Sequence, residues 1–364
     1  MTAILRRVLY GVVAFTCLFF VLWLVLYTTS RSELWDFEVF YSSAATALRG
    51  ENIYRAYGGS ELPYWYFPWV AWFFIPLALL PFNVAKVIYL CLTLLSVFFV
   101  VFVSGQRYSG NLPLATKVFL TAMGLLSCWL LFRVGQVDFI ILAIATAMVL
   151  LIDQERSLTA GVLFPVLLVK PHLLTVFMVF AVLRGGRKFA LSASMSVLFL
   201  SLIAFILLPD WPLEMLRMLS QGGQRTDNSW GFTTFAALLG RQENWSGTGN
   251  PVITLLVALI AFFATWKNRH LPTVPFLAFA MLASMLCAPR AYSYNFPFLL
   301  PALLWLSSYG TVPATLLWLT VGALSLGTRF STGAYLVVLL TFVLAILRAR
   351  SMKRDLAGSG VGSS

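Results

Sequence analysis

The sequence predicts an all-α fold, a polytopic transmembrane helical bundle of about 10–12 spans. Of its 364 residues, 60% are hydrophobic and 10% are charged, whereas an ordinary soluble domain has roughly a quarter charged residues. Uncharged stretches at 8–30, 87–106, 189–209, 244–266 and 271–289 are each close to or longer than the roughly 18–20 residues that cross a bilayer. They lack the period-two alternation of membrane β-barrels, so we expect helices.

The first apolar run predicts an uncleaved signal anchor with a cytoplasmic N-terminus. It follows Arg6 and Arg7, exceeds a signal-peptide core in length and is followed by no small-residue cleavage pattern. From this start, we expect twelve spans near 8–28, 84–105, 115–132, 137–152, 158–170, 171–184, 189–208, 251–266, 272–288, 292–308, 312–326 and 333–348.

Charge placement supports this topology. Fourteen of the 25 basic residues and three of the 13 acids fall on the cytoplasmic side, a surplus of eleven positive charges, and the other side is nearly neutral. This asymmetry follows the positive-inside rule. It places both termini in the cytoplasm and explains the net charge of +12 without nucleic acid.

The sequence predicts one membrane domain over residues 1–354. A Gly/Ser-rich tail follows at 355–364, and we expect it to be disordered. Two long extracytoplasmic loops, 29–83 and 209–250, are the expected carriers of function.

The first outer loop predicts an amphipathic helix lying at the membrane interface. Apolar residues at 37, 40, 41, 44 and 48 share one helical face, and Gly50 ends it. Asp36 stands at the start, where a carboxylate either caps the helix or serves as a general base whose pKa is raised by desolvation. Glu33 and Glu38 are competing acids.

Aromatic residues follow at 64–69, before a stretch broken by Pro76 and Pro81. An interfacial aromatic belt explains such a cluster. The alternative is that rings such as Tyr66 stack on a sugar or contact a lipid tail.

Charged residues interrupt the apolar sequence at two further positions. Arg133 and Asp138 flank a short connection containing Gln136, which predicts either a structural ion pair or part of a cavity. Lys170 precedes Pro171 and His172 within an uncharged stretch. Lys170 either extends its charge to the interface or faces an anionic headgroup beside irregular backbone.

Two more polar segments fall on the outer side. Residues 225–229 include Arg225, Asp227 and Asn228, and a turn is the simple explanation. Arg290 precedes Tyr292, Tyr294 and Asn295, and it either anchors the interface or pairs with a phosphate. Because all these interruptions share one side, we expect them to line a single polar cavity.

These motifs resemble glycosyltransferase family 87, membrane enzymes with a GT-C type of fold. Their order and spacing carry the resemblance, over about residues 30–310: Asp36 with Phe40-Tyr41, Tyr66-Phe67-Pro68, Gly135-Gln136-Val137-Asp138, Lys170-Pro171, Asp227-Asn228-Ser229, and Ala288-Pro289 with Tyr292 to Asn295.

The resemblance implies inverting transfer of a sugar, with mannose first and arabinose second, from a polyprenyl-monophosphate donor to an outer-face acceptor. Asp36 then corresponds to the catalytic base. We assign the donor phosphate to Lys170, Arg290 and Arg225. We place in the substrate cavity Tyr66, Gln136, Asp138, His172, Asp227, Asn228, Tyr292, Tyr294 and Asn295. Many relatives have histidine near 294–295, and this sequence has none there, which leaves the acceptor open.

The expected partners are the lipid-linked donor, a glycolipid or glycan acceptor and the lipids of the cell (plasma) membrane. No cofactor is expected, although Glu33, Asp36 and Glu38 could hold a divalent ion. A transporter or flippase for an anionic lipid-linked substrate is the rival hypothesis. It is disfavoured because no paired broken helices and no cytoplasmic polar cluster are evident.

Overall fold

The computed structural model describes residues 34–54, 63–108, 129–222, 251–288, 293–307 and 339–351, and within these ranges it is helical and contains no strand. The elements are α2 (Trp35–Leu48), α3 (Pro68–Phe73), α4 (Ile75–Ala78), α5 (Phe82–Tyr108), α7 (Trp129–Val134), α8 (Asp138–Asp153), α9 (Ser157–Val162), α10 (Phe164–Leu167), α11 (Pro171–Leu207), α12 (Trp211–Gly222), α14 (Pro251–Lys267), α15 (Thr273–Cys287), the 3-10 helix η1 (Ser293–Leu299) and α16 (Leu300–Ser307). Residues 339–351 are also helical.

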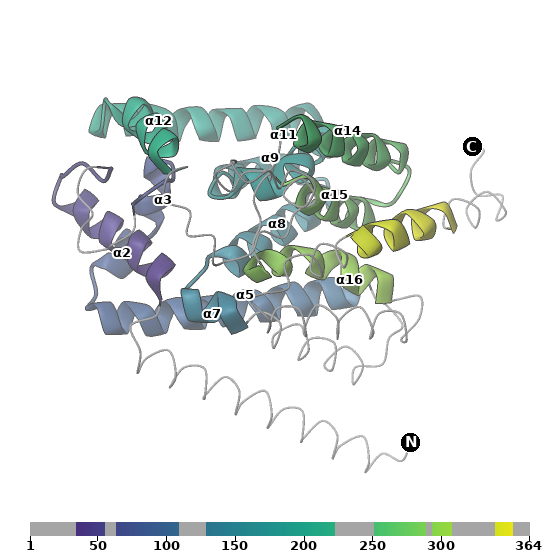
Figure 1. Ribbon diagram of the computed structural model, residues 1–364, viewed down its shortest axis with the longest axis horizontal. Coiled ribbons are helices and arrows are strands. Elements are labelled where there is room, and N and C mark those ends of the chain that lie inside the picture. Colours follow the sequence, from purple (N-terminus) through teal and green to yellow (C-terminus); the bar gives the residue numbers. More distant parts are fainter. Residues whose placement is uncertain are drawn as a thin grey trace, which may run out of the picture.

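The helices form a layered bundle (Figure 1). Helix α5 runs along one edge, α11 and α12 run along the opposite edge, and α8 and α15 lie between them. Helices α2 and α3 sit together at one end of the bundle. This end holds the segment in which the sequence placed its catalytic candidate.

Most expected helices are confirmed where the structure describes them. Helices α5, α8, α14 and α15 match the segments expected at 84–105, 137–152, 251–266 and 272–288. The segments expected at 171–184 and 189–208 form one helical run, α11, which changes direction at Gly186 (φ 69°, ψ −163°). Residues 8–28 and 312–326 lie outside the described residues.

The exterior of the bundle is apolar. Phe82–Val101 and Pro171–Leu207 are each long and apolar enough to cross a membrane, whereas the other apolar helices of the described ranges are shorter. Large side chains on α5, α11 and α14 are exposed, including Leu95, Ile206 and Phe263 at 63%, 79% and 64%. Soluble monomers rarely expose so much contiguous apolar surface, and lipid would cover it.

Helix α2 forms where the sequence predicts it, but it is buried on more than the predicted apolar face, since Val39, Ser42, Ser43 and Thr46 are buried as well. Phe37 and Phe40 are fully buried. Phe37 stacks on Tyr89 of α5 with ring centroids 4.4 Å apart, and Phe40 stacks on Phe74 at 4.7 Å. Leu48, the last residue of the predicted face, is 45% exposed. The aromatic packing fixes the rotation of α2, and Asp36 therefore faces the interior of the bundle.

Gly135, in the turn between α7 and α8, lets this turn approach α2 closely. Its φ is +77°, and an added Cβ would lie 3.0 Å from the Cβ of Phe37 and 3.1 Å from Leu34 Cδ2. The Tyr89 hydroxyl donates a 2.8 Å hydrogen bond to the Gly135 carbonyl. The turn is therefore held from both α2 and α5.

We expect Gly135→Ala to destabilise the protein by about 1–3 kcal/mol more than Gly50→Ala, because only the former adds overpacking. Both glycines have positive φ, but a Cβ at Gly50 would meet nothing within 4 Å. Thermal unfolding of the detergent-purified variants measures the difference. Equal losses of stability would show that the close approach of this turn to α2 does not matter.

Candidate functional site

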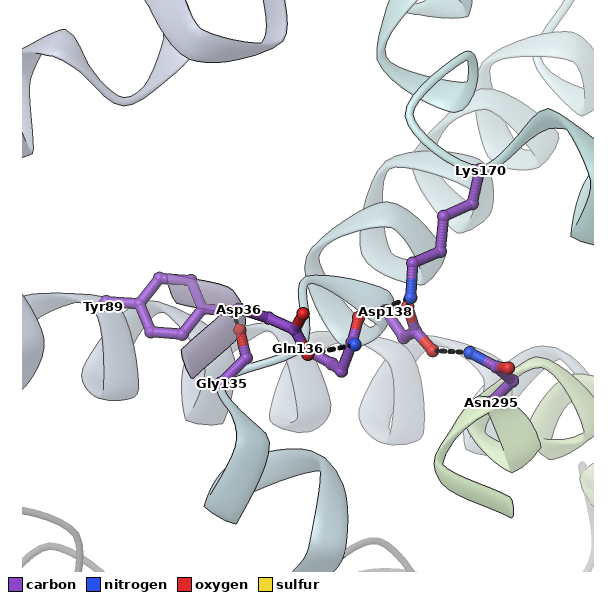
Figure 2. Close-up of polar contacts among 7 residues, drawn as sticks. All are labelled: Asp36, Tyr89, Gly135, Gln136, Asp138, Lys170 and Asn295. Atoms are coloured by element: carbon purple, nitrogen blue, oxygen red, sulfur yellow. Dashed lines mark hydrogen bonds and ion pairs between the residues drawn. The ribbon is translucent and has the colours of Figure 1, made fainter. Parts of the chain in front are cut away.

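Five polar side chains from four parts of the chain form a continuous chain of contacts (Figure 2). The Gln136 amide donates to a carboxylate oxygen of Asp36. The Lys170 ammonium lies 2.5 Å from the Gln136 carbonyl oxygen and 2.5 Å from Asp138 Oδ1. Asn295 Nδ2 donates to Asp138 Oδ2 at 2.6 Å. We call these five residues the relay.

Helix boundaries place the relay residues. Asp138 occupies the first turn of α8, where the helix dipole favours a carboxylate. Lys170 is the N-cap residue of α11, and Pro171 follows at a position where a missing backbone N–H has no cost. Asn295 comes from η1. The relay thus joins four parts of the chain: the start of α2, the turn and helix start at 136–138, the start of α11, and η1.

Asp36 does not cap α2. The N-cap residue is Leu34, and no side-chain cap hydrogen bond is present. The carboxylate instead accepts the Gln136 hydrogen bond. The structure therefore rules out the first of the two explanations that the sequence left open for Asp36.

Burial raises the pKa of Asp36 from 3.8 to about 6, against the opposing charge of Lys170; Asp138 raises it further, and the Gln136 hydrogen bond lowers it. The folded protein thus binds this proton more tightly than the unfolded chain. The contribution of Asp36 to stability is present below its unfolded pKa and is lost as pH rises through about 6.

Asp36 is the most exposed residue of the relay. Asp36 keeps part of its surface accessible although protein surrounds its carboxyl group. By contrast, Gln136, Asp138, Lys170 and Asn295 are 4%, 0%, 5% and 2% exposed. The carboxyl group of Asp36 is enclosed by protein, and the other four relay residues are buried as whole residues.

Two other predicted residues lie nearby. The ring of Tyr66 packs on Phe40 with centroids 4.9 Å apart, and Tyr66 lies within electrostatic reach of Asp36 and Asp138. His172 is in the first turn of α11, close to Lys170 in the chain, and is half-buried. The side chain of Tyr294 and residues Arg225, Asp227, Asn228, Arg290 and Tyr292 lie outside the described part of the structure.

The pairing of charges differs from the ion pair expected between Arg133 and Asp138. Asp138 contacts Lys170 and Asn295 instead, because the start of α8 turns the carboxylate towards the start of α11. Lys170 does not extend to the interface, since it is 5% exposed. Sequence reasoning grouped Asp138, Lys170 and Asn295 but missed Tyr89, which holds the Gly135 turn and carries no motif signal.

The sequence matches the model of glycosyltransferase family 87 over residues 64–289. This range covers more than half of the chain and includes Gln136, Asp138 and Lys170. The chain belongs to glycosyltransferase family 87. Asp36 and Asn295 lie outside the matched range and join the site through the contacts described above. No curated protein and no solved structure matches the chain.

Membership of family 87 makes this protein a membrane glycosyltransferase. The family therefore favours an enzyme over the rival hypothesis of a transporter or flippase. The described residues include no group of three His, Cys, Asp or Glu side chains placed to hold a metal ion. Glu33 lies outside the described residues.

We expect Lys170→Met to destabilise the enzyme by about 3–5 kcal/mol, because it leaves Asp138 buried without its countercharge. The double variant Lys170→Met/Asp138→Asn should recover most of this loss, because it removes both charges. Thermal unfolding at neutral pH gives the comparison, with Lys188→Met as a control that removes an exposed lysine. A Lys170→Met enzyme as stable as this control would contradict the buried ion pair.

Proposed function

We propose that this glycosyltransferase moves a sugar from a polyprenyl-monophosphate donor to a hydroxyl group of a lipid-linked or envelope glycan acceptor, with inversion, on the extracytoplasmic face of the cell membrane. Mannose is the first candidate sugar and arabinose the second. Family membership supports the transfer chemistry, and the charge asymmetry of the sequence supports the sidedness.

The proposed reaction is a single displacement. The acceptor oxygen forms a bond to the anomeric carbon, while the bond from that carbon to the phosphate oxygen breaks and polyprenyl phosphate leaves with the electron pair. Asp36 takes the proton of the acceptor hydroxyl. Because phosphate is a fair leaving group, the enzyme needs chiefly a base, cations near the phosphate and correct positioning.

The carboxylate of Asp36 is the observation that carries this proposal. It belongs to a partly exposed residue, it is oriented by a hydrogen bond from Gln136, and burial of the carboxyl group brings its pKa to about 6. A base with a pKa just below neutral pH is largely ionised and still has useful proton affinity. Glu38, on the same helix, instead lies within electrostatic reach of Lys86.

We assign the departing phosphate to Arg225 and Arg290, which the sequence places on the same side as Asp36. Lys170 was grouped with them on the sequence. Its ammonium is engaged by Asp138 and Gln136, and binding a phosphate would require separating the buried ion pair. No metal ion enters the proposed reaction.

Asp36→Asn should abolish transfer while leaving folding and donor binding intact. The amide retains the size of the carboxylate but cannot accept the proton, and loss of a general base lowers rates by about 10²–10⁴-fold. The assay follows labelled sugar from synthetic polyprenyl-phosphate mannose, then arabinose, into an extract of envelope glycolipids.

Glu38→Gln is the matched control, because it neutralises a neighbouring acid of the same helix, and it should retain activity. Turnover by Asp36→Asn at the wild-type rate would refute the assignment of the base. Loss of activity in Glu38→Gln alone would transfer the role to Glu38.

A further inference from the structure

The orientation of the Gln136 amide is dictated by Lys170. An ammonium group has donors only, so it must face the carbonyl oxygen of the amide rather than its NH₂ group. Lys170 Nζ lies 2.5 Å from that oxygen. The NH₂ group is thereby directed to the other side, where it donates to Asp36. The buried Lys170 thus decides which end of the Gln136 amide meets Asp36.

Lys170 is itself held by Asp138. The carboxylate of Asp138 is fully buried; its Oδ1 forms an ion pair with Lys170 at 2.5 Å, and its Oδ2 accepts a hydrogen bond from Asn295 at 2.6 Å. Each hydrogen bond of the relay therefore has a defined donor and acceptor, from Asn295 to Asp138 and from Lys170 through Gln136 to Asp36, and the ion pair joins the two. Rotating the side-chain amide of Gln136 or Asn295 by 180° would place two donors or two acceptors face to face.

The relay carries one cation between two carboxylates. Lys170 and Asp138 neutralise each other, so ionised Asp36 leaves one net negative charge, and proton uptake by Asp36 leaves the cluster neutral. Because interactions between charges are stronger away from water, a change at either member of the ion pair must alter the proton affinity of Asp36.

We propose that Gln136 and the Lys170–Asp138 ion pair are positioning residues, which orient the Asp36 carboxylate and couple its protonation to a buried charge pair, and that Lys170 does not bind the donor phosphate. This inference rests on the proposed function, because it assumes that Asp36 is the base. Lys170, which the sequence analysis assigned to the donor phosphate, would instead support Asp36.

Other titratable groups around Asp36 constrain the test. Helices α3 and α4, which pack on α2, contain none. Among the described residues, the remaining groups on Asp36's own helix and on neighbouring elements are Glu38 with its nearby Lys86, Tyr41, Tyr66, Tyr89 and the half-buried Arg133 of α7. Burial raises the pKa of Tyr66, which therefore stays neutral near neutral pH. The relay supplies the charges that change in the variants below.

The test is the pH dependence of kcat/KM for transfer from polyprenyl-phosphate mannose to envelope glycolipids. The wild-type rate should rise with pH through an apparent pKa of about 6, as Asp36 loses its proton. Lys170→Met and Gln136→Met should move this acidic limb to higher pH, because each removes a group that favours the carboxylate. Asp138→Asn should move it to lower pH, because it removes a competing negative charge. Shifts of about 1 pH unit are expected for the charge changes.

Opposite shifts of the acidic limb in Lys170→Met and Asp138→Asn distinguish positioning from structural damage. A destabilised fold lowers the rate but does not shift the limb in a direction that depends on the charge removed. Gln136→Met should also lose about 10²-fold in kcat at neutral pH with little change in donor KM, because the base is misplaced. The double variant Lys170→Met/Asp138→Asn keeps the buried site neutral and should fall between the single variants. Lys188→Met should match the wild type.

An unmoved limb in all relay variants would overturn the inference. A Lys170→Met enzyme with a raised donor KM, but with unchanged kcat and an unmoved acidic limb, would also overturn it. Such a result would assign Lys170 to the donor phosphate. If Asp36→Asn is inactive in either case, the proposed function stands and only the relay fails. If Asp36→Asn remains active, the proposed function itself fails.

Discussion

The ion pair between Lys170 and Asp138 is the interaction on which the site depends. Charges that leave water must be paired, and here a single ammonium group serves Asp138 directly and Asp36 through the Gln136 amide. The pairing links the start of α8 to the start of α11. It joins two distant segments of the chain close to Asp36, the proposed base.

The surrounding fold delivers α2 to this ion pair. Stacking of Phe37 and Phe40 on rings from α5 and the α3–α4 connection fixes the rotation of the helix, and the positive φ of Gly135 allows the turn that carries Gln136 to approach it. Apolar packing therefore sets the geometry. Burial raises the pKa of Asp36, and the charges and hydrogen bond of the relay adjust it.

Local features of the sequence predicted much of this arrangement. The spacing of apolar residues gave α2, and Pro171 marked the start of α11 beside Lys170. The identity of the ion pair was not predictable, because helical periodicity reports which residues share a face and not which residues meet across 32 positions. Arg133 was the nearer cation in sequence, and the turn at Gly135 directs Asp138 to Lys170 instead.

Burial, adjusted by the relay, holds the Asp36 carboxylate at a pKa of about 6. Infrared titration of the detergent-purified enzyme carrying ¹³C-labelled aspartate measures this directly and needs no acceptor. The account predicts a protonated-carboxyl band that disappears with an apparent pKa of about 6 and is absent from Asp36→Asn. A titration unchanged in Asp36→Asn, or no aspartate titrating above the ordinary range of about 3.5–4, would contradict it.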